Sequence, residues 1–247
     1  MTTLFDLSTR RALVTGANTG IGQAIAVALA SQGAEVLCAG RRNCDETLEL
    51  IDTVGGKGQY LALDFADPAA ARDSFSGQNI SILVNNAGII RRADSIDYSE
   101  ADWDDVMDVN LKAVFLTSQF FARELFARNA TGSIVNIASL LSFQGGIRVP
   151  AYTASKHGVA GLTKILANEW AAKGINVNAI APGYIATNNT EALRNDAERN
   201  QAILQRIPAG RWGEAADIGG VAAFLCSPAA SYIHGAVINV DGGWLAR

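Results

Sequence analysis

The sequence predicts an α/β protein of one domain, built on a doubly wound parallel sheet with helices on both faces. The chain has 247 residues, 49% of them hydrophobic and 18% charged, which suffices for one substantial core. Short runs rich in β-branched residues alternate with longer helical patterns. The short runs are continuously apolar, as in parallel strands that are covered on both faces. Since no linker, repeat or low-complexity tract interrupts the alternation, we expect a single domain over residues 1–247.

Seven short runs are expected to be strands, and four of the longer patterns are expected to be helices. The predicted strands cover residues 12–15, 35–39, 60–63, 80–84, 133–137, 176–180 and 237–240. The predicted helices cover residues 21–31, 103–128, 152–172 and 215–225. In such a fold, ligands bind at the carboxyl ends of the strands. Residues 187–206 are polar, helical in composition and inserted between a strand and the next helix, so we expect them to form a lid over a substrate.

Charge and cysteine content argue against several classes of protein. The net charge of −4 gives no reason to expect a nucleic acid or an anionic membrane as a partner. Neither a signal peptide nor an apolar run long enough to span a bilayer is visible, so we expect a cytoplasmic location. The three cysteines form no CxxC pair, and only two histidines are present, so no metal site is expected. Cys38 and Cys226 fit the role of small apolar core residues.

A glycine-rich turn directly follows the first predicted strand and opens the first predicted helix. Gly16, Gly20 and Gly22 have the spacing G-x-x-x-G-x-G. Missing side chains let the backbone approach a pyrophosphate, and the helix start presents unpaired N–H groups to it. The alternative is a glycine turn without a ligand. The strand–turn–helix context favours a dinucleotide site.

The end of the second predicted strand carries arginines where an NAD-binding protein carries an acid. An acid there would bind the ribose hydroxyls and repel a 2′-phosphate. This chain has Gly40, Arg41 and Arg42 instead. Either arginine can pair with a 2′-phosphate, which favours NADP over NAD. The alternative is that both arginines are simply solvated.

Tyr152 and Lys156 stand four residues apart in a predicted helix, with Ser139 upstream. Residues i and i+4 share one helix face, so Lys156 can lie beside the Tyr152 phenol and favour its ionised form. This would make Tyr152 a usable acid/base near neutral pH. Taken alone, the pair is more often an ordinary helical contact. The glycine turn and Ser139 together shift the interpretation toward hydride transfer at a carbon that bears oxygen.

With these motifs in view, the chain resembles the short-chain dehydrogenase/reductase family over essentially its whole length. The matching motifs are residues 15–22, 85–88, Asn110, Ser139, Tyr152 with Lys156, and Pro182 with Gly183. The resemblance implies a seven-stranded Rossmann sheet, an NAD(P)-dependent oxidoreductase and commonly a homotetramer. It also implies that Ser139 orients the substrate oxygen and that Tyr152 is the acid/base. Lys156 would bind the nicotinamide ribose and lower the Tyr152 pKa.

The remaining site residues are likewise implied by the resemblance. Asn110 would support a water that relays protons to Lys156, although it can also cap a helix. Asp64 would contact the adenine, although it can also cap the turn after its strand. Ile185 and Thr187 would meet the nicotinamide carboxamide. The implied cofactor-binding residues are Gly16, Asn18, Thr19, Gly20, Ile21, Gly22, Arg41, Arg42, Asp64, Phe65, Asn86, Ala87, Gly88, Tyr152, Lys156, Pro182, Gly183, Ile185 and Thr187.

A narrower resemblance concerns the second half of the chain. Residues 141–150, 181–190, 207–213 and 241–247 are similar to 2-deoxy-D-gluconate 3-dehydrogenases, also described as 2-dehydro-3-deoxy-D-gluconate 5-dehydrogenases, which act in hexuronate breakdown. The similarity is lower around residues 40–42, where that group's usual NAD preference is not matched. A sugar acid carries a carboxylate and several hydroxyls, so its pocket needs a cation and polar groups.

Four residues are candidates for binding such a substrate. Arg148 and Gln144 lie between Ser139 and Tyr152, Arg92 follows the 85–88 motif, and Asn188 begins the insertion. Each has the alternative of a surface or interface residue, and Arg148 is the favoured carboxylate ligand. Gluconate 5-dehydrogenase and 3-oxoacyl carrier-protein reductase are the alternative enzymes. A dinucleotide-sensing regulator without catalysis is the alternative from another class.

Overall fold

The computed structural model describes residues 4–67 and 76–247, and the strands in these ranges form one parallel sheet. The strand order is β3-β2-β1-β4-β5-β6-β7, so the predicted doubly wound sheet is confirmed. The strands are β1 (Arg11–Thr15), β2 (Glu35–Gly40), β3 (Lys57–Ala62), β4 (Ile82–Asn85), β5 (Gly132–Ile137), β6 (Ile175–Pro182) and β7 (Val237–Val240). The order reverses between β1 and β4, where such sheets bind their ligands.

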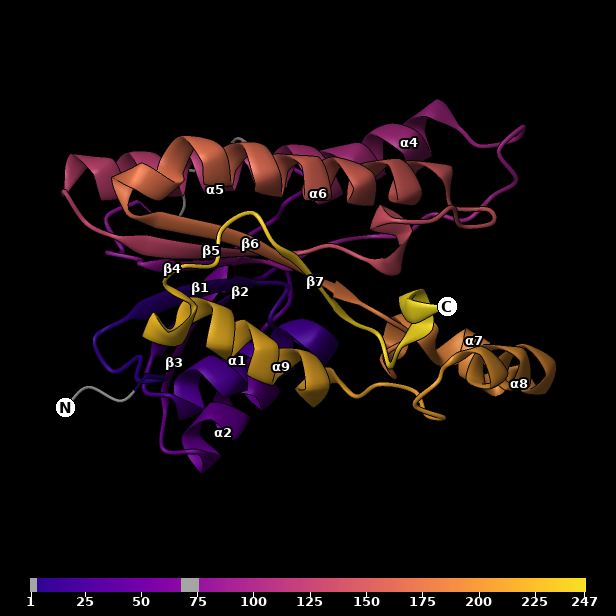
Figure 1. The fold of residues 1–247 in the computed structure, drawn as a ribbon, viewed down its shortest axis with the longest axis horizontal. Helices are drawn as coiled ribbons and strands as arrows, with labels where there is room; N and C mark the ends of the chain where they lie inside the picture. Colours follow the sequence, from indigo (N-terminus) through magenta and orange to yellow (C-terminus); the bar gives the residue numbers. More distant parts are fainter. Residues whose placement is uncertain (1–3, 68–75) are drawn as a thin grey trace.

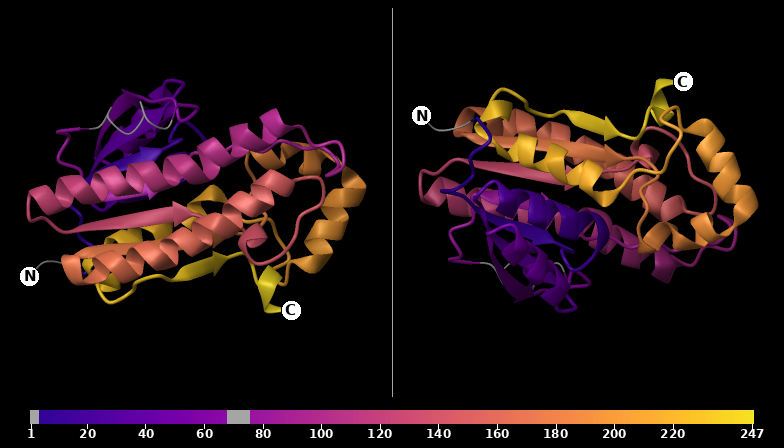
Figure 2. Two further views of the ribbon diagram at one scale, coloured as in Figure 1. Left: turned by 90° about the horizontal axis from the view of Figure 1, so that it is seen from above. Right: turned by 90° about the horizontal axis from the view of Figure 1, so that it is seen from below.

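Helices cover both faces of this sheet (Figure 1). The helices are α1 (Gly20–Ser31), α2 (Asp45–Thr53), α4 (Glu100–Met107), α5 (Ala113–Ala127), α6 (Pro150–Trp170), α7 (Glu191–Asn195), α8 (Ala197–Arg206) and α9 (Ala215–Cys226). One layer holds α4, α5 and α6, and the other holds α1, α2 and α9. Both views in Figure 2 place α7 and α8 beyond the carboxyl ends of the strands, near the C-terminus. Among the described helices, none has the length and apolar character of a membrane span.

Two hydrophobic cores form because successive residues of a strand point to opposite faces. Val14 and Val84 pack into the core under α1 and α9, whereas Leu13 and Leu83 pack into the core under α5 and α6. The central strands are therefore buried on both sides, as their continuous apolar runs predict. The prediction is wrong for β3, where Lys57–Ala62 is mostly exposed, because this edge strand pairs only with β2.

Most predicted helix boundaries are shifted by one or two residues, and two differences are larger. The predicted helix 103–128 is two helices, α4 and α5, joined by the π-helix η1 (Asp108–Lys112). Helix α4 starts at Glu100, earlier than predicted, because Ser99 caps it. The Ser99 side chain accepts a bond from the Asp102 N–H at 3.1 Å. Helix α2 has no counterpart among the four predicted helices. A π-helix within an α-helix frequently marks a functional position.

A buried polar ladder joins the middle of the sheet to α5 and α6. The Asn85 amide nitrogen donates to the Asn136 side-chain oxygen at 2.8 Å and to the Ser118 hydroxyl at 3.0 Å. The Thr117 hydroxyl donates to the Asn85 oxygen at 2.8 Å, and the Asn136 amide donates to the Thr163 hydroxyl at 3.0 Å. All five side chains are buried. Buried amides are tolerated here because each finds a partner.

Replacing Asn136 by Ala tests this ladder. The change leaves the Asn85 amide without one of its acceptors, so we expect the free energy of unfolding to fall by about 2 kcal/mol. Urea unfolding at fixed protein concentration measures it. The control, Asn195→Ala on the exposed surface of α7, should change stability by less than about 0.5 kcal/mol. Equal effects of the two changes would show that the ladder contributes nothing specific.

Candidate active site

Three adjoining cavities form one cleft along the carboxyl edge of the sheet. The first has a volume of about 320 Å³ and contains Arg41 and Arg42, and the second has about 260 Å³ and contains the glycine turn. The third, of about 430 Å³, is lined in part by Leu193 of α7 and by Arg199 and Arg206 of α8. The first and second cavities share Gly16 and Gly88, and the second and third share Tyr152. Tyr152 therefore stands at the junction between the two halves of the cleft.

The glycine turn brings the backbone of β1 and α1 close to the second cavity. Gly16 and Gly20 have φ angles of +65° and +58°, which side-chain-bearing residues rarely adopt. A Cβ on Gly22 would collide with the Gly16 carbonyl oxygen and the Asn86 amide. No side-chain bond from the N-cap residue Thr19 closes the start of α1. The turn thus leaves helix N–H groups facing a cavity, as an anion site requires.

Thr15 and Asn86 hold the two sides of this crevice together. The Thr15 hydroxyl accepts bonds from the N–H groups of Asn86 and Ala87, each at 2.9 Å, and donates to the Val84 carbonyl at 3.2 Å. The Asn86 amide donates in turn to the carbonyls of Thr15 at 2.9 Å and Gly16 at 3.2 Å. The segment after β4 is therefore fixed against the glycine turn.

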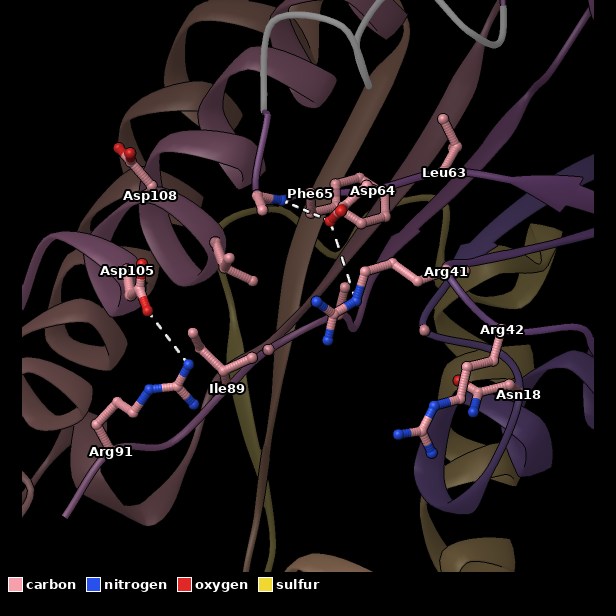
Figure 3. A pocket seen from close by; sticks show the side chains of 16 residues that line it. Asn18, Arg41, Arg42, Leu63, Asp64, Phe65, Ile89, Arg91, Asp105 and Asp108 are labelled. Carbon is pink, nitrogen blue, oxygen red and sulfur yellow. Dashed lines mark hydrogen bonds and ion pairs between the residues drawn. The ribbon is translucent and has the colours of Figure 1, made fainter. Parts of the chain in front are cut away.

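Arginines and aspartates both line the first cavity, as Figure 3 shows. The Arg41 Nε lies 4.0 Å from an Asp64 carboxylate oxygen, and both side chains are more than half exposed. The same Asp64 oxygen accepts a bond from the Ala66 N–H at 2.9 Å, so Asp64 lines the cavity and also caps its own turn. Within the described residues Arg42 has no ion-pair partner. Arg91, across the cavity, is neutralised by Asp102 and Asp105.

Tyr152 and Lys156 lie on the first turns of α6, as predicted. The Lys156 Nζ is 5.5 Å from the centre of the Tyr152 ring and donates to the Ile137 carbonyl at 2.6 Å. Ser139, which follows β5, caps a 3₁₀ turn by accepting a bond from the Leu141 N–H at 3.1 Å. Ser139 and Tyr152 both line the third cavity, whereas Lys156 lines the second.

Burial controls the ionisation of this pair. It raises the pKa of Tyr152, and a hydrogen bond with Ser139 and the charge of Arg92 only partly oppose the rise. Desolvation therefore outweighs the opposing contributions, and the pKa of Tyr152 lies above its ordinary value. The lowering of this pKa by Lys156 stays a prediction. Burial also lowers the pKa of Lys156 from 10.5 to about 8. A lysine with this pKa exchanges protons close to neutral pH.

Asn110 lies in the π-helix η1 and is buried beside the cleft. Its side-chain oxygen accepts a bond from the Ile89 N–H at 2.8 Å, and its amide donates to the Ile89 carbonyl at 2.9 Å. A longer bond of 3.4 Å reaches the Ser155 hydroxyl on α6. Asn110 thus ties the segment after β4 to the helix of Tyr152. Its role in supporting a proton-relay water stays a prediction.

The predicted cofactor and substrate residues divide among the three cavities. Asn18, Asp64, Phe65, Ala87 and Gly88 line the first cavity with the two arginines, while Thr19, Ile21, Asn86, Thr187 and Asn188 line the second. Pro182, Gly183 and Ile185, predicted to bind the cofactor, line the third cavity with Arg92 and Gln144. Asn188 lines the second cavity together with Tyr152 and Lys156, and its role in binding the substrate stays a prediction.

The structure does not support Arg148 as a substrate ligand. Its Nε lies 3.1 Å from a carboxylate oxygen of Asp94, and Arg148 is not among the residues that line the three cavities. Its φ of +64° turns the backbone so that its carbonyl accepts a bond from the Ala93 N–H. Arg148 therefore joins two loops at the rim of the cleft. This pairing depends on tertiary contacts that spacing along the chain does not reveal.

The third cavity is also lined by residues that sequence reasoning missed, four of which are aromatic or basic. These four are Tyr184, Arg199, Arg206 and Trp244. The two arginines lie seven residues apart on α8, a spacing that places them on one helix face. This spacing could have indicated a basic helix face, because the sequence predicts that residues 187–206 cover a substrate.

Comparison with known proteins agrees with this geometry. A family model described as enoyl-(acyl carrier protein) reductase matches residues 16–245. The 2-dehydro-3-deoxy-D-gluconate 5-dehydrogenase of Bacillus subtilis (strain 168) is 54% identical over 248 residues, covering 98% of this chain and 97% of that protein.

Two solved structures are also similar to this chain in sequence and in fold. A candidate 2-deoxy-D-gluconate 3-dehydrogenase from Agrobacterium tumefaciens, with bound NADP, is 71% identical with a TM-score of 0.98, covering 99% of this chain and 100% of that one. A candidate NAD(P)-dependent gluconate 5-dehydrogenase from Beutenbergia cavernae, with NADP at low occupancy, is 49% identical with a TM-score of 0.94 and the same coverage.

Lys156→Met should stabilise the ligand-free protein at pH 7. The folded-state pKa of about 8 lies below the ordinary lysine pKa of 10.5, so below pH 8 the folded protein holds a charge whose burial is unfavourable. Removing it should raise the free energy of unfolding by at most about 3 kcal/mol. Between pH 8 and 10.5 the folded wild type has released this proton while the unfolded chain keeps it, so wild-type stability rises and the difference shrinks.

Unfolding curves at pH 7 and pH 9 measure this dependence. Lys164→Met, which changes an exposed lysine of the same helix, should show no such pH dependence. A Lys156→Met protein that is less stable than wild type at pH 7 would show that the bond to the Ile137 carbonyl outweighs the unfavourable burial.

Proposed function

The chain belongs to the short-chain dehydrogenase/reductase family and is an NAD(P)-dependent oxidoreductase of CH–OH groups, and we propose that its substrate is a sugar acid. The proposed reaction interconverts a secondary alcohol and a ketone on a hexonate of the 2-deoxy-D-gluconate or 2-dehydro-3-deoxy-D-gluconate type, in hexuronate breakdown. The observation that carries this proposal is the position of Tyr152. It separates a glycine-lined cavity from a cavity with arginines in its wall.

The residues present fit a dinucleotide. Gly16, Gly20 and Gly22 line the second cavity, so the backbone itself borders the space where a pyrophosphate would lie, and the open start of α1 supplies N–H donors. At the other end, Arg41 and Arg42 line the first cavity, and these two arginines directly follow β2 where an NAD-binding protein carries an acid. We therefore propose that NADP is preferred over NAD. The NADP bound in the two similar structures supports this preference.

In the proposed chemistry, Tyr152 moves a proton at its phenolic oxygen. From alcohol to ketone, it accepts the hydroxyl proton as the carbon gives up a hydride, and in the reverse direction it returns a proton to the ketone oxygen. Ser139 hydrogen-bonds the same oxygen and orients it. The positive charge of Lys156 lies close to the ring and favours the phenolate. NADP, when bound, supplies the nicotinamide carbon that exchanges the hydride.

Residues 187–206 are proposed to act as a lid over the reacting groups. They form α7, α8 and a short 3₁₀ turn, and Thr187, Leu193 and Arg199 line the third cavity. A lid that excludes water strengthens the electrostatic contacts inside the site. The homotetramer that is common in the family is also part of the proposal, and its mass in solution tests it.

A panel of hexonates and ketodeoxy sugar acids, assayed with NADP(H) and NAD(H), tests the substrate class. Gluconate 5-dehydrogenase is the second candidate, because the similar Beutenbergia cavernae structure carries that description. A carrier-protein reductase would instead turn over 3-oxoacyl thioesters. Turnover of no compound by a protein that binds NADP would favour the dinucleotide-sensing regulator.

Tyr152→Phe should abolish turnover while leaving NADP binding nearly unchanged. The change removes the proton donor but leaves the glycine turn intact, so kcat should fall by about 10²- to 10⁴-fold. Steady-state kinetics and a fluorescence titration with NADPH measure the two effects. Tyr232→Phe, at a tyrosine that is 97% exposed, is the control. Retained activity in Tyr152→Phe would assign the acid/base to another group.

Arg41→Ala should weaken NADP binding far more than NAD binding. Loss of one charge-assisted contact to a phosphate raises the dissociation constant by about 10- to 100-fold. NAD has no 2′-phosphate, so its dissociation constant should change little. Arg123→Ala removes an exposed charge on α5 that lines none of the three cavities and serves as the control. Equal weakening of both dinucleotides would rule out recognition of the 2′-phosphate by Arg41.

A further inference from the structure

Helix α8 presents a face of two arginines and one isoleucine toward the substrate side of the cleft. Arg199, Ile203 and Arg206 follow the spacing i, i+4, i+7, which places them on one side of a helix. Both arginines line the third cavity. Ile203 packs against the small apolar cluster of Leu140, Ile207 and Trp244 that anchors this face.

Arg206 is held by an aromatic platform. Its guanidinium carbon lies 4.0 Å from the centre of the Trp244 ring, and this ring lies 4.7 Å from the Tyr184 ring. The Trp244 indole N–H donates to the Gln144 side-chain oxygen at 3.3 Å. Stacking on an indole fixes the plane of a guanidinium while leaving its N–H edge free for an anion.

Burial raises the pKa of the Tyr184 phenol. The charges of Arg206 and, to a smaller extent, Arg199 oppose this rise. The two charges therefore converge on one region of the cavity wall. Within residues 4–67 and 76–247, no ion pair engages Arg199 or Arg206, in contrast to Arg148, which pairs with Asp94. Both arginines are exposed residues without a counter-ion in these ranges, so their guanidinium groups are available to pair with an anion in the cavity.

Arg92 lines the same cavity. Its charge acts on Tyr152, which places it close to the reacting oxygen. In a hexonate that reacts at C5, the carboxylate at C1 is four carbon–carbon bonds away from the reacting carbon. A carboxylate held by Arg92 would lie beside Tyr152, whereas one held by α8 lies toward the lid.

We propose that Arg206 and Arg199 of α8 bind the substrate carboxylate at the lid end of the cavity, and that Arg92 contacts the hydroxyls near the reacting carbon. This assignment rests on the proposed sugar-acid function. It makes α8 the element that distinguishes an acid from a neutral sugar. The planar fork of Arg206, fixed on Trp244, is suited to a bidentate contact with a carboxylate.

The test compares a hexonate that the wild type turns over with its uncharged amide, for example D-gluconate with D-gluconamide. If the amide is not turned over, its inhibition constant against the acid is measured. Arg206→Met and Arg199→Met keep the apolar stem and remove the charge. Each should raise the KM for the acid by about 10- to 100-fold and change the constant for the amide by less than about threefold.

Further variants separate charge from packing. Arg206→Lys keeps the charge without the fork and should lie between wild type and Arg206→Met. Arg123→Met, the control on α5, should leave both constants unchanged. Arg92→Met should affect the acid and the amide alike. NADP affinity and melting temperature of each variant report whether the fold is intact.

Each outcome decides the matter. Equal losses on acid and amide in the α8 variants would assign Arg199 and Arg206 to packing and overturn the proposal. Loss of the acid preference in Arg92→Met alone would move the carboxylate to Arg92 and also overturn it. If the wild type turns over no acid in the panel, the proposed function itself fails, a result that is visible before any variant is made.

Discussion

The crevice between β1 and β4, where the strand order reverses, is the constraint on which the site depends. On one side the chain runs outward through β2 and β3, and on the other through β5, β6 and β7. The Thr15 hydroxyl and the Asn86 amide bridge the crevice just beyond the last paired residues. Because Gly22 packs against this bridge without a side chain, the start of α1 comes close enough to serve as an anion site.

Burial around Tyr152 opposes the ionisation that acid/base catalysis requires of this residue. The same desolvation that protects a hydride transfer from water disfavours the phenolate of Tyr152 and the ammonium of Lys156. Ser139 and Arg92 offset part of this for the tyrosine, and the Ile137 carbonyl gives the lysine a single acceptor. Burial therefore disfavours the charged forms of both groups, and their neighbours compensate only in part. Such perturbed pKa values are common for catalytic pairs.

Site features that depend on local spacing can be predicted from the sequence. Side-chain pairs that join distant segments of the fold cannot. The turn at Gly16–Gly22 and the Tyr152–Lys156 pair are found where the spacing places them, because strand, turn and helix follow one another along the chain. The Arg148–Asp94 pair and the Asn110 contacts with Ile89 join segments more than 20 residues apart, so no local pattern reveals them. The arginine face of α8 lies between these cases. Its helical spacing is visible, but its aromatic platform is not.

The ladder of buried amides beneath the sheet has a consequence for the geometry of catalysis. Thr163 lies two turns of α6 beyond Lys156 and receives the bond from Asn136 near the carboxyl end of β5. This bond fixes both the rotation of α6 about its axis and its position along the strand. Since β5 also leads into Ser139, one strand sets the relative placement of all three reacting side chains. The buried polar side chains thus fix the position of the Tyr152 phenol relative to the Ser139 hydroxyl.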